Sequence, residues 1–344
     1  MAQLSAPAKK KSLYRVAVIG CGKIGALFEA EPKREKPASH AGTVMAHDRT
    51  ELAALVDTNT KNLTAARKLF PRAASYTSLT ECLKSEQLDV VIIATPPAAR
   101  LALLKECARF GIPMVVCEKP LARNVKEAKQ MEAIVAKSGM TFVLNYQRRF
   151  SPLFARLRSD IKKIKLGKIQ QVTCYYSNGL HSNGGHIINS LLYVLGDDIV
   201  SAVGFENAMN KTHPTGDPNR DALLTTKKGA KIVLQSLDQK EYGIHDIRIF
   251  GTKGSVVLTD YGMTLIETPA RPSRFAEVRQ LDASKERSVH KPLSATKDAL
   301  AEVIDCYEKR RVPESSAGSG VATLKVLDAL SKSAKSGGKE IAVR

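Results

Sequence analysis

The feature that most constrains the fold of this 344-residue chain is a glycine-rich turn directly after an apolar segment. Residues 14–19 read YRVAVI, and residues 20–25 read GCGKIG. Such an apolar run is typical of a strand buried on both faces of a parallel sheet. The first glycine of the motif permits a tight bend, the second lets a phosphate approach the backbone, and the third lets helix and strand pack closely. The motif predicts a dinucleotide-binding turn, with a purely steric turn as the alternative. Its residues are Gly20, Cys21, Gly22, Lys23, Ile24 and Gly25.

Apolar and amphipathic segments alternate after this turn, as strands and helices do in α/β domains. The strand candidates are residues 51–57, 88–95 and 113–119, and the helix candidates are residues 59–70, 97–110 and 124–138. This alternation predicts right-handed crossovers and a parallel sheet. We therefore predict an α/β fold in which residues 13–123 form a Rossmann dinucleotide-binding domain.

From about residue 150 the sequence changes to short alternating segments punctuated by glycine, which is typical of antiparallel hairpins. Helical patterns at residues 187–195, 294–309 and 319–334 suffice to cover one face of a sheet. We predict that residues 124–344 form a substrate-binding and oligomerisation α+β domain on an open, mainly antiparallel sheet. The uncovered face of that sheet predicts a homodimer or homotetramer. Residues 1–12 are predicted to be a flexible basic tail.

Charge and composition narrow the class of partner. Lys and Arg number 53 against 34 Asp and Glu, and the net charge of +19 indicates an anionic partner. Nucleic acid is disfavoured, because aromatic residues make up only 5% and the basic residues are spread along the chain. No apolar run is long enough to cross a membrane, and six scattered cysteines without a CxxC pair suit the cytoplasm. We predict no metal site, because His181 and His186 do not share a helix face.

Asp57 ends the second strand candidate, where a carboxylate can accept hydrogen bonds from the hydroxyls of an adenine ribose. It lies further beyond Gly25 than the usual ~20 residues, and a polar loop with two prolines accounts for the excess. Its charge would repel a 2′-phosphate, so we predict NAD as the cofactor, while Lys61 and Arg67 keep NADP as the alternative. Asp57 as a strand-end residue that caps the next helix is the other interpretation.

Two further strand ends suit a cofactor crevice, because ligands of open α/β sheets bind beyond the carboxyl ends of strands. The predicted contacts there are Thr95, Pro96, Pro97, Glu118 and Lys119. The Lys119 ammonium suits a nicotinamide ribose, a substrate hydroxyl or acid–base chemistry. A structural ion pair between Glu118 and Lys119 is the alternative.

The segments GCGKIG, ATPP, CEKPLA and NYQRRFSP, in this order, resemble the glucose–fructose oxidoreductase, inositol dehydrogenase and rhizopine-catabolism (Gfo/Idh/MocA) family. The resemblance covers roughly residues 13–344. It implies an NAD(P)-dependent dehydrogenase or reductase that acts on a hydroxyl or keto carbon of a sugar, polyol or nucleotide-linked sugar. It also implies that Lys119 is catalytic and contacts both substrate and cofactor. The segment GLHSNGGH resembles the family's D-x-x-x-H motif, which makes His186 the general base.

The sequence departs from that motif at two positions. Ser182 and Asn189 stand where many members have aspartate, and Asn183 is the remaining candidate partner for His186. The GL-x-x-NG-x-H form resembles a branch linked to sugar-nucleotide and surface-polysaccharide metabolism. Without a carboxylate the imidazole is a weaker base. A cofactor-binding sensor or regulatory scaffold with lost turnover is therefore the alternative function.

Substrate contacts are predicted at the junction of the two domains and around the histidine motif. Arginine side chains suit the hydroxyls or the anionic group of a sugar substrate. Asn145 is expected to brace them, and for Arg149 a structural ion pair is the alternative. The predicted substrate-binding residues are Tyr146, Arg148, Arg149, Asn183 and His186.

Overall fold

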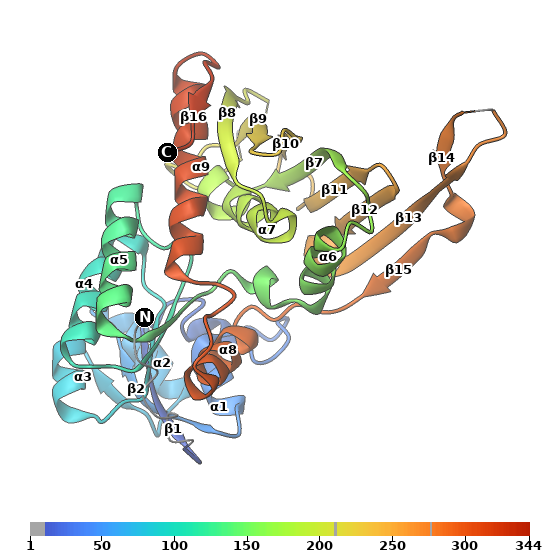
Figure 1. Ribbon diagram of the computed structural model, residues 1–344. Coiled ribbons are helices and arrows are strands. Elements are labelled where there is room, and N and C mark those ends of the chain that lie inside the picture. The colour runs from blue at the N-terminus through green and yellow to red at the C-terminus, as the bar shows by residue number, and fades with distance from the viewer. Residues whose placement is uncertain (1–10, 210–211, 276) are drawn as a thin grey trace. The chain divides into compact units, whose positions relative to one another are not determined.

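The computed structural model describes residues 11–209, 212–275 and 277–344 (Figure 1). By its contacts the chain divides into two compact units. The first contains the residues up to Phe150 and Ser294–Val321, and the second contains Ser151–Leu293 and Ala322–Arg344. Of the tail predicted over residues 1–12, the first ten lie outside the described residues. Lys11 forms an ion pair with Asp89, with 2.5 Å between Nζ and Oδ1.

The first unit is built on a parallel six-stranded sheet with the order β3-β2-β1-β4-β5-β6, which confirms the predicted Rossmann-type fold. The strands are β1 (Tyr14–Ile19), β2 (Thr50–Val56), β3 (Ala74–Tyr76), β4 (Val90–Ile93), β5 (Met114–Cys117) and β6 (Thr141–Leu144). The helices are η1 (Leu27–Ala30), α1 (His40–Ala46), α2 (Thr60–Leu69), α3 (Leu79–Ser85), α4 (Pro97–Arg109), α5 (Val125–Ser138), η2 (Gln147–Phe150) and α8 (Lys297–Lys309).

The position of β1 in the sheet follows from its sequence. It lies between β2 and β4, and Val16 pairs with Leu52 on one side and Val90 on the other. A strand covered on both faces needs apolar residues at nearly every position, as YRVAVI provides. Because neighbouring strands run in parallel, their carboxyl ends meet at one edge of the sheet, and the predicted cofactor contacts follow those ends.

The helix that follows the glycine motif is interrupted. An irregular turn and the four-residue η1 follow the motif, and the chain then leaves over residues 31–39. Helix α1 resumes the interrupted helix, because the N–H of His40 donates to Ile24 O and the N–H of Ala41 donates to Gly25 O, both at 2.9 Å. The polar stretch with two prolines is thus an insertion within the first crossover helix, and it places the start of α1 beside the motif.

The second unit contains an open sheet with the order β14-β13-β12-β11-β7-β10-β9-β8-β16, in which β15 also pairs with β13. Among the described strand pairs of this second sheet, only β7 and β10 are parallel. This confirms the predicted, mainly antiparallel sheet. The strands are β7 (Ile169–Ser177), β8 (Ile199–Glu206), β9 (Arg220–Thr226), β10 (Lys231–Leu237), β11 (His245–Gly251), β12 (Gly254–Thr259), β13 (Thr264–Pro272), β14 (Arg279–Leu281), β15 (Arg287–His290) and β16 (Ile341–Ala342).

Helices cover one face of this second sheet. Its helices are α6 (Pro152–Lys162), the π-helical turn η3 (Leu180–Gly184), α7 (Gly185–Leu195) and α9 (Ala317–Lys335), with the short 3-10 turns η4 (Asp260–Gly262) and η5 (Ala283–Lys285). Helix α9 packs directly on β8, since a Cβ on Gly204 would lie 2.5 Å from Leu330 O. In Figure 1, β13 and its partners β14 and β15 extend from the sheet as a long arm.

Helix α8 packs on the first sheet and not on the second, where it was expected. Helix α8 packs against β5 and β6 of the first sheet, so the expectation that it covers the second sheet is wrong. Its buried apolar face, with Leu300 and Val303 in the core of the first unit, explains this placement. Helix α5 and strand β6 also belong to the first unit by contact, because β6 continues the parallel sheet beyond β5. The division at residue 123 stays a prediction.

Candidate active site

The glycine turn has an open side where a pyrophosphate can approach. Gly20 has a φ of +92°, a conformation that favours glycine. A Cβ on Gly25 would lie 1.8 Å from Gly20 O, so only glycine permits this packing. A Cβ on Gly22 would meet no atom within 4 Å, and the backbone there faces open space. The three positions therefore have the steric properties that the motif predicts.

The other side chains of the turn differ in exposure. Cys21 is fully buried, and its Sγ lies 3.6 Å from Val56 O. Burial, together with the charge of Asp57, raises the pKa of the Cys21 thiol to about 12. Lys23 is exposed and Ile24 is half-buried. The Cys21 thiol is thus not accessible to a ligand, whereas the exposed Lys23 presents a cation at the surface.

Asp57 ties the end of β2 to the glycine turn. Its Oδ2 accepts a hydrogen bond from the N–H of Cys21, and its Oδ1 accepts one from the N–H of Asn59, both at 2.8 Å. Asn59 is the N-cap of α2, so helix capping falls to that residue and not to Asp57. Asp57 fixes the turn from which the dinucleotide would be bound.

Glu118 follows β5 and is the centre of a buried hydrogen-bond network. Its Oε1 accepts hydrogen bonds from His40 Nε2 (2.8 Å) and Asn145 Nδ2 (2.7 Å). Its Oε2 accepts one from the backbone N–H of Lys119 at 3.1 Å. Asn145 Nδ2 also donates to Ala295 O at 2.8 Å. The start of α1, the end of β5 and the segment after β6 therefore meet at one carboxylate.

The environment keeps Glu118 ionised. Burial by itself raises the pKa of this carboxyl group, but the hydrogen bonds from His40 and Asn145 and the nearby Arg100 outweigh burial and lower the pKa. A buried charge is tolerated only where partners replace its lost hydration. The network supplies those partners, and one of them is the backbone of Lys119.

Arg100 on α4 joins the ends of β4 and β5. The side chain is only 3% exposed. Its Nε and Nη2 donate to Thr95 O at 2.9 and 2.7 Å, and its Nη1 donates to Glu118 O and Pro120 O. A guanidinium suits this task, because its fixed fork of donors can bridge several carbonyl groups.

Several buried polar atoms at this sheet edge have no hydrogen-bond partner among the described residues: Thr95 Oγ1, Asn145 Oδ1 and His40 Nδ1. Buried polar groups are rarely left unsatisfied in folded proteins. A nicotinamide dinucleotide carries amide and hydroxyl groups that can pair with such atoms. Together with the open space at Gly22, these atoms fit the predicted cofactor.

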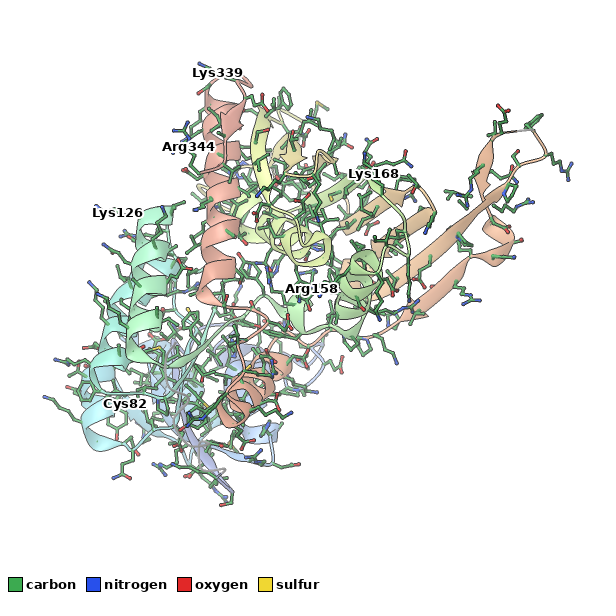
Figure 2. All side chains as sticks on the ribbon, in the orientation of Figure 1. Cys82, Lys126, Arg158, Lys168, Lys339 and Arg344 are labelled. Carbon is green, nitrogen blue, oxygen red and sulfur yellow. The ribbon has the colours of Figure 1, made fainter. Side chains whose placement is uncertain are left out.

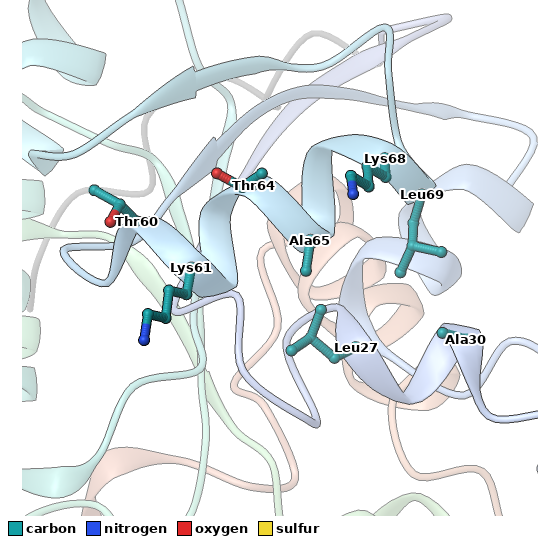
Figure 3. A pocket seen from close by; sticks show the side chains of 8 residues that line it. All are labelled: Leu27, Ala30, Thr60, Lys61, Thr64, Ala65, Lys68 and Leu69. Atoms are coloured by element: carbon teal, nitrogen blue, oxygen red, sulfur yellow. The ribbon is translucent and has the colours of Figure 1, made fainter.

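A cavity of about 530 Å³ lies between η1 and α2 (Figure 3). Apolar side chains and two lysines line it: Leu27, Ala30, Thr60, Lys61, Thr64, Ala65, Lys68 and Leu69. Neither Asp57 nor Glu118 is among them. We therefore do not assign this cavity to the network around Glu118.

In the second unit the histidine motif begins in the π-helical turn η3, which runs directly into α7. The carboxylate of Asp217 holds this turn, because Oδ1 accepts the N–H of His181 at 2.7 Å and Oδ2 accepts the N–H of Ser182 at 2.8 Å. A carboxylate at a helix start is favoured by the free N–H groups and the helix dipole. The segment that lacks the motif aspartate thus receives a carboxylate from a distant loop.

The imidazole of His186 lies beside a second imidazole. The ring centroids of His186 and His245 are 6.4 Å apart, with an edge-to-face angle of 75°. His245 starts β11 and is almost fully buried, whereas His186 is half-buried. Burial lowers the pKa of the nearby His181, and the charge of Asp217 only partly offsets this effect. The His181 imidazole therefore favours its neutral form.

Asn189, which replaces the second motif aspartate, has a structural contact. Its Nδ2 donates to Thr323 Oγ1 at 2.9 Å, and both side chains are buried. The bond joins α7 to α9. A carboxylate at this position would be a buried charge, and the amide avoids that cost.

The predicted substrate contacts have unequal exposure. Tyr146 and Arg148 are buried, with 2% and 6% exposed. Arg149 donates from Nη1 to Glu314 O at 3.0 Å. Asn183 is half-buried, and its N–H donates to Gly179 O at 3.0 Å. Arg149 is thus more exposed than Tyr146 and Arg148.

The structure brings the predicted residues together in two groups, one in each unit. Thr95, Glu118 and Lys119 lie at one sheet edge, where Pro96 and Pro97 begin α4. Asn183 and His186 share the η3–α7 segment. These assignments to cofactor, substrate and catalysis stay predictions.

Four residues of these groups were not singled out in the sequence: His40, Arg100, Asp217 and His245. His40, Asp217 and His245 lie far along the chain from the residues they contact, whereas Arg100 follows Thr95 by five residues. The one local signal was at His40, a polar residue at the start of the helix that resumes after the insertion. Arg100 and Asp217 resemble ordinary surface residues in the sequence, so no local pattern could have revealed them.

Comparison with known proteins supports the motif interpretation. Residues 14–146 match the Gfo/Idh/MocA model, described as an oxidoreductase family with an NAD-binding Rossmann fold. An uncharacterized oxidoreductase, YrbE, of Bacillus subtilis is 25% identical over 205 residues, which are 54% of this chain and 60% of that protein. Inositol 2-dehydrogenase of Pseudarthrobacter chlorophenolicus is 27% identical over 229 residues, 62% of this chain and 64% of that enzyme. The matches thus span less than two thirds of these two relatives.

Solved structures share the fold over nearly the full chain. An oxidoreductase domain protein from Kribbella flavida has a TM-score of 0.80 and 19% identity, covering 97% of this chain and 100% of that one. The WlbA dehydrogenase from Bordetella pertussis, in complex with NADH and UDP-GlcNAcA, has a TM-score of 0.74 and 21% identity, covering 96% and 99%. At these identities the likeness shows the fold.

These observations define a Rossmann-type dinucleotide-binding fold in the first unit. Its residues 14–146 are similar to the Gfo/Idh/MocA family model, in agreement with the resemblance that GCGKIG and CEKPLA indicated. Among the described residues, no helix is both long and apolar enough to cross a membrane.

Proposed function

We propose that the protein is an NAD-dependent oxidoreductase that transfers a hydride between nicotinamide and a hydroxyl or keto carbon of a sugar, polyol or nucleotide-linked sugar. The observation that carries the proposal is the sheet edge of the first unit. There the open backbone at Gly22 and the unpartnered atoms of Thr95 and Asn145 accompany the ionised Glu118 and Lys119. Relatives named inositol 2-dehydrogenase and the WlbA complex support the substrate class.

In this proposal the first unit binds the cofactor and holds the substrate hydroxyl. When bound, the nicotinamide accepts or donates the hydride. The Lys119 ammonium hydrogen-bonds the reacting oxygen and stabilises the negative charge that develops on it as its proton leaves. Glu118 keeps the backbone of Lys119 in place through the bond to its N–H.

We assign the proton transfer to His186. A neutral imidazole can accept the hydroxyl proton. The ring of His186 lies edge-to-face with the buried ring of His245, which holds it beside that wall of the unit. Asp217 positions the turn that precedes His186 and does not take the proton itself. Asn183, one turn before the histidine, is the proposed contact to a substrate hydroxyl.

NAD is the proposed cofactor, with NADP as the less favoured alternative. Asp57 places a carboxyl group where the ribose hydroxyls would bind, and the N–H groups of Cys21 and Asn59 hold it there. A 2′-phosphate at that place would meet this carboxylate. Lys61 lines the neighbouring cavity, where it can weaken the repulsion.

We also propose that the protein forms a homodimer or homotetramer through the sheet of the second unit. Val203, Leu223 and Val233 are in register across β8, β9 and β10, on the sheet face opposite to the buried Leu224 and Ile232. Leu223 is 38% exposed. An apolar row of this kind on an uncovered sheet face favours a partner sheet.

A cofactor-binding sensor or scaffold is the second candidate. The observation that favours it is Asn189, whose amide is used to join α7 to α9 where other members have an acid. Such a protein would bind NAD and respond to a sugar without turnover.

The two candidates are separated by adding NAD or NADP and a panel of polyols and nucleotide-linked sugars to the full chain. Binding is measured by calorimetry, and turnover by the near-ultraviolet absorbance of the reduced nicotinamide. Substrate-dependent reduction of NAD supports the oxidoreductase. Tight NAD binding without reduction across inositols and UDP-GlcNAcA supports the sensor, and failure to bind either dinucleotide contradicts both.

A further inference from the structure

We infer that the second unit carries an anion-binding pocket, separate from the histidine motif, that takes a small organic phosphate. The pocket has a volume of about 400 Å³ and lies between the α6–β7 connection and strands β12, β13 and β15. This size suits a small molecule. Its lining includes the cationic side chains Arg156, Lys165, Lys253, Lys285 and Arg287.

Part of this positive charge is already neutralised. Arg156 is paired with Glu267, and Lys165 is paired with Asp160 at 2.6 Å. These two acids are the carboxylates that line the pocket. Both acidic side chains of the lining are therefore engaged in ion pairs with Arg156 and Lys165.

Three cations remain. Lys253, Lys285 and Arg287 form no ion pair among the described residues, and all three are exposed. They come from three segments: the β11–β12 turn, η5 and β15. The nearby Asp282 is paired with Arg271 at 3.3 Å and also interacts with Lys285, so it offsets the charge of Lys285 only in part. The lining still carries five cations against the two carboxylates of Asp160 and Glu267. This excess of positive charge favours a dianion such as a phosphate monoester.

The backbone that carries Lys253 is fixed before any ligand binds. Its N–H donates to Leu166 O at 2.9 Å, and its carbonyl accepts the N–H of Ala270 at 2.8 Å. A Cβ on Gly251 would lie 2.1 Å from Leu166 O, which shows how closely the two connections pack. A rigid base reduces the entropy lost when a ligand is bound.

The remaining wall of the pocket is apolar. Leu157, Leu166 and Val256 are buried side chains, and Pro269 adjoins them. An inorganic ion would leave this wall unused, whereas a phosphate that carries a ring or an alkyl group would cover it. The chemistry of the lining therefore favours an organic phosphate over free phosphate.

The pocket is distinct from the histidine motif of the same unit. The α6–β7 connection precedes the first residue of β7, whereas η3 and α7 follow its last residue. Strand β7 has nine residues, so its ends lie roughly 26 Å apart at ~3.3 Å per residue. The inference therefore does not depend on the proposed oxidoreductase activity.

The test is calorimetric titration of the full chain, saturated with NAD, with phenyl phosphate and with inorganic phosphate. We expect phenyl phosphate to bind more tightly than inorganic phosphate. The Lys253→Glu/Arg287→Glu variant should weaken phenyl phosphate binding by at least about tenfold. The matched control is Lys168→Glu. Lys168 is an exposed lysine of the α6–β7 connection that does not line the pocket (Figure 2).

Equal binding by the pocket variant and the control, or no advantage of phenyl phosphate over inorganic phosphate, would overturn the inference. So would the absence of any binding by the unmodified chain. Should the double variant fail to fold, the single variant Arg287→Gln is used, since this exposed residue has no ion pair among the described residues to lose. It should weaken phenyl phosphate binding by roughly threefold to tenfold, and unchanged binding would contradict the site.

Discussion

The two units use a carboxylate in different ways. In the first, Glu118 is buried and receives hydrogen bonds from two side chains and one backbone N–H. In the second, the Asp217 carboxylate accepts hydrogen bonds from the backbone N–H groups of His181 and Ser182 at the start of η3. The first arrangement organises an ionised group within a network, and the second stabilises a helix start. The difference shows that a carboxylate can hold side chains together in one unit and a helix start in the other.

The largest expected effect is the loss of turnover when Lys119, whose backbone N–H donates to Glu118, is replaced. Lys119→Ala should lower turnover by at least ~100-fold, because the reacting oxygen loses its charged hydrogen-bond donor. NAD binding should change little, since the glycine turn and Asp57 are untouched. Steady-state kinetics and calorimetry measure the two effects. Lys126→Ala, an exposed lysine of α5, is the control, and an active Lys119→Ala enzyme would refute the role.

The next largest effect should be on stability. Glu118→Ala removes the acceptor of three donors and should lower the free energy of unfolding by about 3 kcal/mol. Urea unfolding measures the change. Glu127→Ala removes the ion pair between Glu127 on α5 and the exposed Arg123, and it should cost only a small fraction of that value. Equal costs for the two variants would show that the buried network does not stabilise the fold.

The same network predicts a pH dependence. The pKa of Glu118 is lower in the folded chain than in the unfolded one, so the carboxylate stabilises the fold above its ordinary pKa of about 4.3. This contribution is lost as the pH falls through the lowered pKa. Glu118→Gln should therefore flatten the loss of stability below about pH 4.3, measured by urea unfolding. If Glu118→Gln loses stability at low pH as the unmodified chain does, groups other than Glu118 cause that loss.

In the second unit a smaller stability effect is expected. Asp217→Ala leaves the N–H groups of His181 and Ser182 without their acceptor, which should cost about 1–2 kcal/mol. Hydrogen exchange at these two amides should accelerate, and Asp217→Asn should retain part of the protection. If exchange at these amides is unaffected by Asp217→Ala, the carboxylate does not hold η3.

Whether an element or a contact could be predicted from the sequence depends on how far apart along the chain its residues lie. The predicted strand at residues 14–19 coincides with β1, and the helix predicted at 124–138 differs from α5 by one residue. These elements follow from local periodicity. The π-helical turn and the placement of α8 depend on tertiary packing, so the sequence pattern did not reveal them. The same holds for the sites: GCGKIG and EKP were visible, whereas His40 and Asp217 join them from distant segments.

The smallest expected effect concerns the choice of cofactor. Asp57→Ser removes the charge that would repel a 2′-phosphate and should shift the ratio of NAD to NADP affinity by roughly tenfold toward NADP. The variant also loses a strong acceptor for the Cys21 N–H, so both affinities should fall somewhat. Calorimetric titrations with both dinucleotides measure the ratio. An unchanged ratio would show that another residue selects the cofactor.

Isotope transfer is the most direct test of hydride transfer assisted by Lys119. The full chain is incubated with NADH that carries deuterium at both hydrogen positions of nicotinamide C4 and with the keto form of the best substrate from the panel, and the product is analysed by mass spectrometry. We expect one deuterium on the product's carbinol carbon with the unmodified chain and almost none with Lys119→Ala. Reduced product without deuterium, or equal labelling by the two proteins, would contradict it.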